Sequence, residues 1–268
     1  MATTGNTTQR LYIRVSRRNL SFTVYQPFGG MPPVVENYEV NPTASLNVNL
    51  KEALAQLPLA QEKYQRAEVM LNVPFTLKPV ELFREEDAAA IYRKCFADVE
   101  YDRVLYDVAG SLGAVLVYGM SEMFCRVIDE TYPSVRYLSS TTAMANRFAD
   151  KARGSDRNQV FAYSHEDMLD MFVFSSGRLQ LGNRYEIHGV DDAVYFVMLA
   201  VQILGLDVHR DEFHVLEYGN SEAGLAEKLK NFLADVRPGD ALTEFGNSPV
   251  SNSLRLPYDM MAFLLQPF

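Results

Sequence analysis

The side chains best suited to metal binding or nucleophilic catalysis in this 268-residue sequence are four histidines and two cysteines. His209 and His214 are five residues apart, which puts them on opposite faces of a strand and about 140° apart on a helix, so they are not expected to share a metal ion. Neither Cys95 nor Cys125 has a histidine partner that the sequence suggests, and both lie in apolar helical patterns typical of free, buried thiols. The sequence contains no Gly-x-Ser-x-Gly elbow and no Walker loop. These residues therefore predict no catalytic site and no metal site.

One glycine-containing turn lies where an anion could bind. Gly219, Asn220 and Ser221 connect a predicted strand over 213–217 to a predicted helix over 222–233. The N-terminus of a helix attracts anions through its unpaired N–H groups. The same three residues also suit an ordinary turn followed by a helix N-cap. The sequence leaves both interpretations open.

The composition excludes some classes of partner. The net charge is −9, and no run of basic residues is longer than the pair Arg17 and Arg18. An acidic surface repels phosphate backbones, so nucleic acid is not an expected partner. The longest apolar stretch, 193–206, is shorter than the roughly 20 residues of a membrane span, and the N-terminus has no signal-peptide pattern. We expect a cytoplasmic protein with no direct membrane insertion and a disordered N-terminus over 1–9.

Apolar and polar residues alternate in the first part of the chain, which is typical of half-buried strands. Leu11, Ile13 and Val15 form one such series, and the pattern resumes at Leu20 after a turn over 16–19. A third strand over 34–40, a helix over 48–57, a strand over 69–73 and a helix over 79–96 are expected to follow. The same order returns later, with strands over 160–163, 168–174 and 179–187, a helix over 191–204, a strand over 213–217 and a helix over 222–233.

Three short matches support this repeat. Ser16-Arg17-Arg18-Asn19-Leu20 falls opposite Ser164-His165-Glu166-Asp167-Met168, Asn37-Tyr38-Glu39-Val40 falls opposite Arg184-Tyr185-Glu186-Ile187, and Arg93-Lys94-Cys95-Phe96 falls opposite Leu229-Lys230-Asn231-Phe232. The three matches occur in the same order on the same predicted elements. The sequence therefore predicts a duplicated β-β-β-α-β-α unit.

A further segment separates the two copies. Apolar runs over 104–108 and 114–118 are split by glycines, which predicts a hairpin. An amphipathic helix over 121–132, a short strand over 135–138 and a helix over 141–152 are expected next, and the charged stretch 151–158 is the expected hinge. We therefore expect a first lobe over 10–152 and a second lobe over 153–268. The apolar tail over 258–265 must be buried, either against its own lobe or against a partner, and docking on its own lobe, the second, is the favoured interpretation.

This order of elements resembles the actin-like ATPase fold, which is a duplicated ribonuclease-H-like unit. The stretch 115–152 is similar to the end of the first lobe in the small bacterial members that assemble type IV pili and type II secretion machinery. The chain also resembles an uncharacterised bacterial family assigned to this fold. The resemblance spans about 10–267 and implies an α/β fold with two ribonuclease-H-like lobes in an actin-like arrangement, each with a mixed sheet and flanking helices.

The resemblance also implies where a nucleotide would bind. Members of the fold hold phosphates on two hairpin turns, each typically with an Asp near a Gly-rich loop, because Gly lets backbone N–H groups approach phosphate and Asp holds Mg²⁺ through water. Here the turns 16–19 and 164–167 contain no glycine, and the first strand contains no carboxylate. We therefore expect neither ATP hydrolysis nor a two-metal nuclease reaction, and no cofactor.

Some residues could still contact ATP or another anion in the interlobe cleft, although both hairpin turns are also consistent with solvated tips. These residues are Ser16, Arg17, Asn19, Ser164, His165, Gly219, Asn220 and Ser221.

Two functions of different classes follow from the resemblance. The chain is either a catalytically inert scaffold that recognises another protein, or a protein that binds a nucleotide or other anionic small molecule between its lobes. In the pilus relatives, the actin-like protein captures a short segment of a membrane-anchored partner in a groove, and the resemblance places such a groove near 104–132. The residues expected to line it are Gly110, Gly113, Met120, Met123 and Phe124. The alternative is that these side chains only complete the core of the lobe.

Overall fold

The computed structural model describes residues 10–26, 31–97, 102–218, 224–246, 248–251 and 256–265. The segment 1–9, which is expected to be disordered, lies outside the described residues. The chain divides into two compact units: unit 1 holds 1–108, 114–143 and 247–268, and unit 2 holds 109–113 and 144–246. Among the described residues, no helix is long and apolar enough to cross a membrane.

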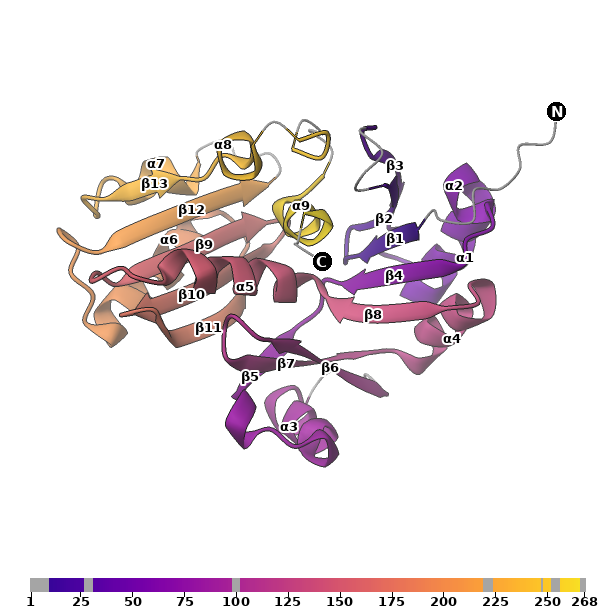
Figure 1. The fold of residues 1–268 in the computed structure, drawn as a ribbon, viewed down its shortest axis with the longest axis horizontal. Helices are drawn as coiled ribbons and strands as arrows, with labels where there is room; N and C mark the ends of the chain where they lie inside the picture. Colours follow the sequence, from indigo (N-terminus) through magenta and orange to yellow (C-terminus); the bar gives the residue numbers. More distant parts are fainter. Residues whose placement is uncertain are drawn as a thin grey trace. The chain divides into compact units, whose positions relative to one another are not determined.

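A five-stranded sheet forms the centre of unit 1, with the strand order β3-β2-β1-β4-β8 (Figure 1). Its strands are β1 (Arg10–Val15), β2 (Asn19–Tyr25), β3 (Val34–Glu39), β4 (Arg66–Leu71) and β8 (Val135–Ser139). The first three strands are antiparallel, whereas β4 runs parallel to both β1 and β8. Nearly every residue of β1, β2 and β4 is buried, so both faces of the sheet are covered at its centre.

Unit 1 also contains a three-stranded sheet with the order β5-β7-β6, inserted between β4 and β8. Its strands are β5 (Phe75–Pro79), β6 (Arg103–Ala109) and β7 (Ala114–Met120). Two short 3₁₀ helices, η1 (Val80–Leu82) and η2 (Glu85–Asp87), lead from β5 to α3 (Ala88–Cys95). Tyr92 of α3 packs against Val115 and Val117 of β7, which gives this sheet a small core of its own. The described part of unit 2 contains no such sheet.

Three further helices of unit 1 are α1 (Leu46–Gln56), α2 (Pro58–Gln61) and α4 (Glu122–Thr131). The side chains of Ser45 and Ser121 accept hydrogen bonds from backbone N–H groups in the first turns of α1 and α4, as N-caps do. The two cysteines are free, but only Cys125 of α4 is buried. Cys95 is exposed, contrary to the expectation of two buried thiols, because it is the last residue of the short helix α3.

Unit 2 is built on a second five-stranded sheet, with the order β11-β10-β9-β12-β13. Its strands are β9 (Gln159–His165), β10 (Met168–Ser175), β11 (Arg178–Glu186), β12 (Glu212–Tyr218) and β13 (Val236–Pro238), and its helices include α6 (Val190–Leu204), α7 (Leu225–Leu229) and α8 (Ala241–Phe245). One face of the sheet packs against α6 and α7 in a core that includes Leu169, Val197 and Leu229. Helix α6 ends at Gly205, whose φ of 63° is a left-handed conformation that glycine adopts without strain.

The two five-stranded sheets repeat each other in strand order and in register. In unit 1, Leu20 pairs with Val15 on one side and with Tyr38 on the other. In unit 2, Leu169 makes the corresponding pairs, with Ser164 and Tyr185. These pairings show that Leu20 corresponds to Leu169, one residue beyond the Met168 that the sequence match indicates. The difference matters because a shift of one residue turns each side chain to the opposite face of the sheet.

The third sequence match does not join equivalent elements. Helix α3, which contains Arg93 and Lys94, packs on the inserted three-stranded sheet. Helix α7 instead follows the parallel strand β12 and packs beside α6. The element of unit 1 that corresponds to α7 is α4, which packs beside α1. The match between 93–96 and 229–232 is therefore accidental.

The helix at the end of each copy packs in the other unit. Most of α5 (Ser140–Ala152) belongs to unit 2, where Phe148 stacks on Phe161 of β9 with 4.7 Å between ring centroids. The C-terminal helix α9 (Tyr258–Leu264) belongs to unit 1, where Asp259 accepts a hydrogen bond of 2.9 Å from the buried guanidinium of Arg14. The tail thus docks on unit 1 and not on the lobe that precedes it, and the unit boundaries differ from the expected 10–152 and 153–268.

Asp259→Ala tests how much this contact contributes. The change removes the carboxylate that faces Arg14, and both side chains of the pair are at most 4 % exposed. We expect the free energy of unfolding, measured with urea, to fall by about 3–5 kcal/mol, because the buried guanidinium loses the counter-charge that Asp259 supplies. Asp191→Ala, which breaks the exposed pair with Lys228, is the control and is expected to cost less than about 1 kcal/mol. Equal losses in the two variants would contradict the role assigned to Asp259.

Candidate functional site

A groove lies in unit 1 where the ends of its two sheets meet. It has a volume of about 380 Å³. Three consecutive residues of β6 and three of β8 form its two sides, and the start of α5 and one residue of α9 complete it. We call it the edge groove, and its lining residues are Tyr106, Asp107, Val108, Arg136, Tyr137, Leu138, Thr142, Ala143 and Phe263.

Both sides of the edge groove are edge strands. Among the described strands, β6 is the last of the three-stranded sheet and β8 is the last of the five-stranded sheet. Successive side chains of a strand point to opposite faces, so three consecutive lining residues mean that the strand's own backbone lines the groove. The outer edge of a terminal strand carries N–H and C=O groups without partners in the sheet.

Asp107 fixes the two sides of the groove to each other. Its carboxylate accepts hydrogen bonds from the backbone N–H of Ser139 at 2.6 Å, from the hydroxyl of Thr142 at 2.7 Å and from the hydroxyl of Tyr118 at 2.9 Å. Burial raises the pKa of Asp107, while these three donors act in the opposite direction. A strand of the inserted sheet is thereby tied to the junction of β8 and α5.

Six of the nine residues that line the groove are aromatic or aliphatic. Val108 is 58 % exposed, although an aliphatic side chain in a strand is usually covered. Tyr137 is held by its hydroxyl, whose single hydrogen lies within reach of two acceptors, a carboxylate oxygen of Asp129 at 2.8 Å and the backbone oxygen of Cys125 at 3.0 Å. Burial raises the pKa of Tyr137 well above its usual range, so this hydroxyl stays protonated.

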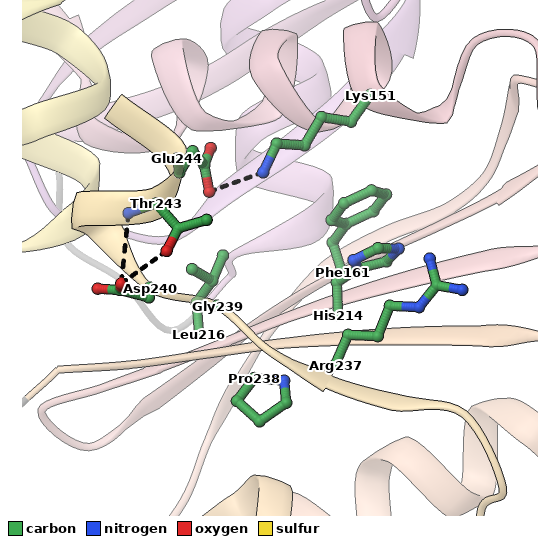
Figure 2. Close-up of a pocket in the computed structure, with 10 residues that line it drawn as sticks. All are labelled: Lys151, Phe161, His214, Leu216, Arg237, Pro238, Gly239, Asp240, Thr243 and Glu244. Carbon is green, nitrogen blue, oxygen red and sulfur yellow. Dashed lines mark hydrogen bonds and ion pairs between the residues drawn. The ribbon is translucent and has the colours of Figure 1, made fainter. Parts of the chain in front are cut away.

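A second cavity, of about 240 Å³, lies in unit 2 at the corresponding end of its sheet (Figure 2). The rings of Phe161 and His214 stack within it, with centroids 4.6 Å apart. Figure 2 shows Glu244 of α8 reaching the ammonium of Lys151 at the end of α5, and the two are 2.6 Å apart. Burial is the main cause that lowers the pKa of His214, and the nearby Arg237 acts in the same direction.

The two cavities occupy equivalent positions in the repeat. Val135 and Arg136 of β8 stand opposite Ala67 and Glu68 of β4. In unit 2, Val236 and Arg237 of β13 stand opposite Phe213 and His214 of β12. The inserted sheet closes one side of the cavity in unit 1, and unit 2 uses α8 and its preceding loop instead.

The family assignment follows from a match that covers most of the chain. Residues 1–236 match a family described as a protein of unknown function, DUF3822. The chain belongs to the DUF3822 family. Among curated proteins, none matches it.

Two solved structures identify the fold of this DUF3822 member. A Bacteroides thetaiotaomicron protein, described as having an actin-like ATPase fold and unknown function, is 25 % identical with a TM-score of 0.83, over 100 % of this chain and 99 % of its own. A PilM–PilN type IV pilus biogenesis complex contains a chain that is 11 % identical with a TM-score of 0.56, over 97 % of this chain and 100 % of its own. The predicted fold class, an α/β actin-like ATPase fold, and the predicted membership of an uncharacterised family with that fold are confirmed.

The residues expected to contact a nucleotide lie in different surroundings. In unit 1, Ser16 is buried and its hydroxyl donates to the backbone oxygen of Asn19 at 3.1 Å, while Arg17 is exposed. In unit 2, Ser164 is partly buried in β9. The turn 219–221 lies outside the described residues.

His165 does not reach a surface. It is 1 % exposed, and its Nε2 lies 3.3 Å from a carboxylate oxygen of Asp170. Asp170 also binds the guanidinium of Arg184 on β11, which holds the pKa of this carboxyl far below its usual range despite its burial. The expected role of His165 in contacting an anion is therefore not supported, because the side chain belongs to a buried ion cluster.

The segment 104–132 contributes to the edge groove, but through other residues than expected. Met120 and Phe124 are fully buried and complete the core, as in the alternative interpretation, and Met123 is exposed on α4. The groove instead uses 106–108 of the segment, together with residues of β8, α5 and α9 that the sequence did not single out. A carboxylate inside an apolar run, Asp107, was the only local signal.

Metal chemistry is not indicated by the described residues. Among them, no group of three or more histidine, cysteine, aspartate or glutamate side chains could hold a metal ion.

His214 is expected to make the stability of the protein depend on pH. Its pKa in the folded protein is lower than the ordinary 6.5, so the unfolded chain binds a proton more tightly. The free energy of unfolding should therefore fall as the pH drops below about 6.5. His214→Phe keeps a ring to stack on Phe161 but removes the titration, and it should flatten this dependence in urea unfolding between about pH 7 and pH 5. An unchanged slope in the His214→Phe variant would contradict the prediction.

Proposed function

We propose that this DUF3822 protein is a non-catalytic, actin-like interaction module that binds an extended segment of a partner protein in the edge groove. The observation that carries the proposal is the pair of edge strands at the groove, with 106–108 of β6 on one side and 136–138 of β8 on the other. Two terminal strand edges beside exposed aliphatic and aromatic side chains are the arrangement that strand addition uses.

The binding mode that fits this geometry is strand addition. An extended segment pairs its main chain with the free edge of β6 or β8, and its alternate side chains contact the groove wall. Val108, Leu138 and Phe263 supply apolar contacts. Asp107 takes no part in binding, because its oxygens already accept three hydrogen bonds, and its role is to keep the two sides of the groove in place.

The PilM–PilN structure supports an interaction role for the fold. In that structure a chain with a TM-score of 0.56 to this one is part of a type IV pilus biogenesis complex. A protein partner for this DUF3822 member is therefore in keeping with the fold, although fold similarity by itself assigns no function. We further propose that the protein acts in the cytoplasm, without inserting into a membrane itself and without nucleic acid as a partner.

The alternative function is binding of ATP or another anionic small molecule. The sequence of the two hairpin turns weighs against it, since neither turn contains the glycine that would let the backbone approach a phosphate. In the first turn the Ser16 hydroxyl is already engaged with Asn19, from which it also accepts a hydrogen bond of 3.0 Å.

Photo-crosslinking from the groove tests the proposed function. A photoreactive amino acid in place of Val108, in the full chain expressed in its native host, should crosslink to one protein through one short segment identified by mass spectrometry. Val34 is the matched control, because it is 57 % exposed, against 58 % for Val108. It lies on β3, which is the edge of the five-stranded sheet opposite to β8 and so away from the groove. The same products from both positions, or none from Val108 in the folded protein, would contradict the proposal.

Calorimetric titration with ATP, with and without Mg²⁺, tests the alternative. We expect no binding up to about millimolar ATP, because a phosphate without backbone N–H donors or a metal ligand gains little in water. Binding at millimolar concentration or tighter would instead favour the nucleotide function.

A further inference from the structure

Two equivalent arginines of the repeat differ in their partners. Arg237, at the second cavity, donates hydrogen bonds to Asp235 at 2.8 Å and to Glu212 at 2.9 Å. Arg136, at the edge groove, is exposed and makes no hydrogen bond and no ion pair with any residue in the described ranges. The duplication thus supplies an internal comparison: Arg237 is held by hydrogen bonds to two carboxylates, whereas the N–H donors of Arg136 are bound by no side chain among the described residues.

The nearest acidic group of the groove does not neutralise Arg136. Arg136 acts to lower the pKa of Asp107, but the two groups form no ion pair. The oxygens of Asp107 face three donors of the protein's own, which belong to Ser139, Thr142 and Tyr118. A planar guanidinium with its N–H donors unused is well suited to a carboxylate, which it can bind through two parallel hydrogen bonds.

We propose that the edge groove selects a segment that carries an aspartate or glutamate among apolar residues, and that Arg136 binds this carboxylate. The inference rests on the proposed function and adds the chemistry of the partner. The alternation of a strand fits it. Phe263 contacts Tyr12, and the register sets Tyr12, Glu68 and Arg136 side by side, so Phe263 and Arg136 lie on the same face of the sheet. Residues two positions before or after a carboxylate that faces Arg136 therefore point toward this apolar side chain.

An extended segment fits the groove better than a small free anion does. Three residues of a strand span about 10 Å, so each side of the groove offers main-chain pairing over that length. Tyr106 and Val108 would stay uncovered beside a small anion, whereas apolar side chains of a segment cover them. Arg136 alone gives a small anion only one charged contact, which is weak in water.

Selection from a display library of random peptides on the whole folded protein tests the inference. Wild-type protein should enrich peptides with Asp or Glu at one position between apolar residues. Arg136→Gln should weaken binding of a selected peptide by about tenfold, because a charge-assisted pair is lost. Arg136→Glu should reverse the preference and enrich Lys or Arg at that position. Arg237→Gln, the matched control from the equivalent strand, should leave the preference for Asp or Glu unchanged.

The outcomes separate this inference from the proposed function. Peptides count as binding in the groove if they bind more weakly to Val108→Asp than to Val34→Asp. If such peptides show no preference for acidic residues, the role of Arg136 is overturned and the interaction module stands. A preference that survives Arg136→Glu would do the same. Failure to enrich any peptide that depends on Val108 counts against both. Binding of inorganic phosphate at the groove with no peptide enriched would replace the segment with a small anion.

Discussion

The structure depends on the need of each five-stranded sheet to cover two faces. One face of the unit 2 sheet is covered by helices of its own copy, as α6 and α7 show. The other face is covered by the helix that ends the opposite copy in sequence: α5 packs on β9 in unit 2, and α9 packs on β1 in unit 1. A buried parallel strand needs apolar cover on both sides, so neither unit is complete without a helix from the other half of the chain.

The two copies meet this need with different chemistry. In unit 1 the contact includes an ion pair between Arg14 and Asp259, with Tyr12 and Phe263 packed edge to face 5.9 Å apart. In unit 2 it is a stack of aromatic rings around Phe148 and Phe161. A buried ion pair specifies one geometry because an unpaired charge is costly, whereas stacked rings gain free energy from the apolar area that they cover.

The inserted three-stranded sheet changes the first copy most. It places the edge of β6 beside the edge of β8, and Asp107 joins the two through its hydrogen bonds. The cavity that both copies share becomes a groove with two strand edges in unit 1 only. Its phenylalanine wall comes from α9, so the docking of the C-terminal helix and the shape of the groove depend on the same contact with β1.

The sequence by itself determined most of the strands, their repeated order and the fold class, because alternation of apolar residues reports which side of a strand is buried. It did not predict β5 or β13. It did not determine the register of the repeat to one residue, the burial of His165 or the exposure of Cys95, since these depend on which element packs against which. The tertiary structure alone decided that α9 docks on β1, a contact between residues 245 positions apart. An apolar helix face shows that the helix must be covered, but it does not show which element covers it. The edge groove needs β6, β8, α5 and α9 together, so it could not be derived from local patterns.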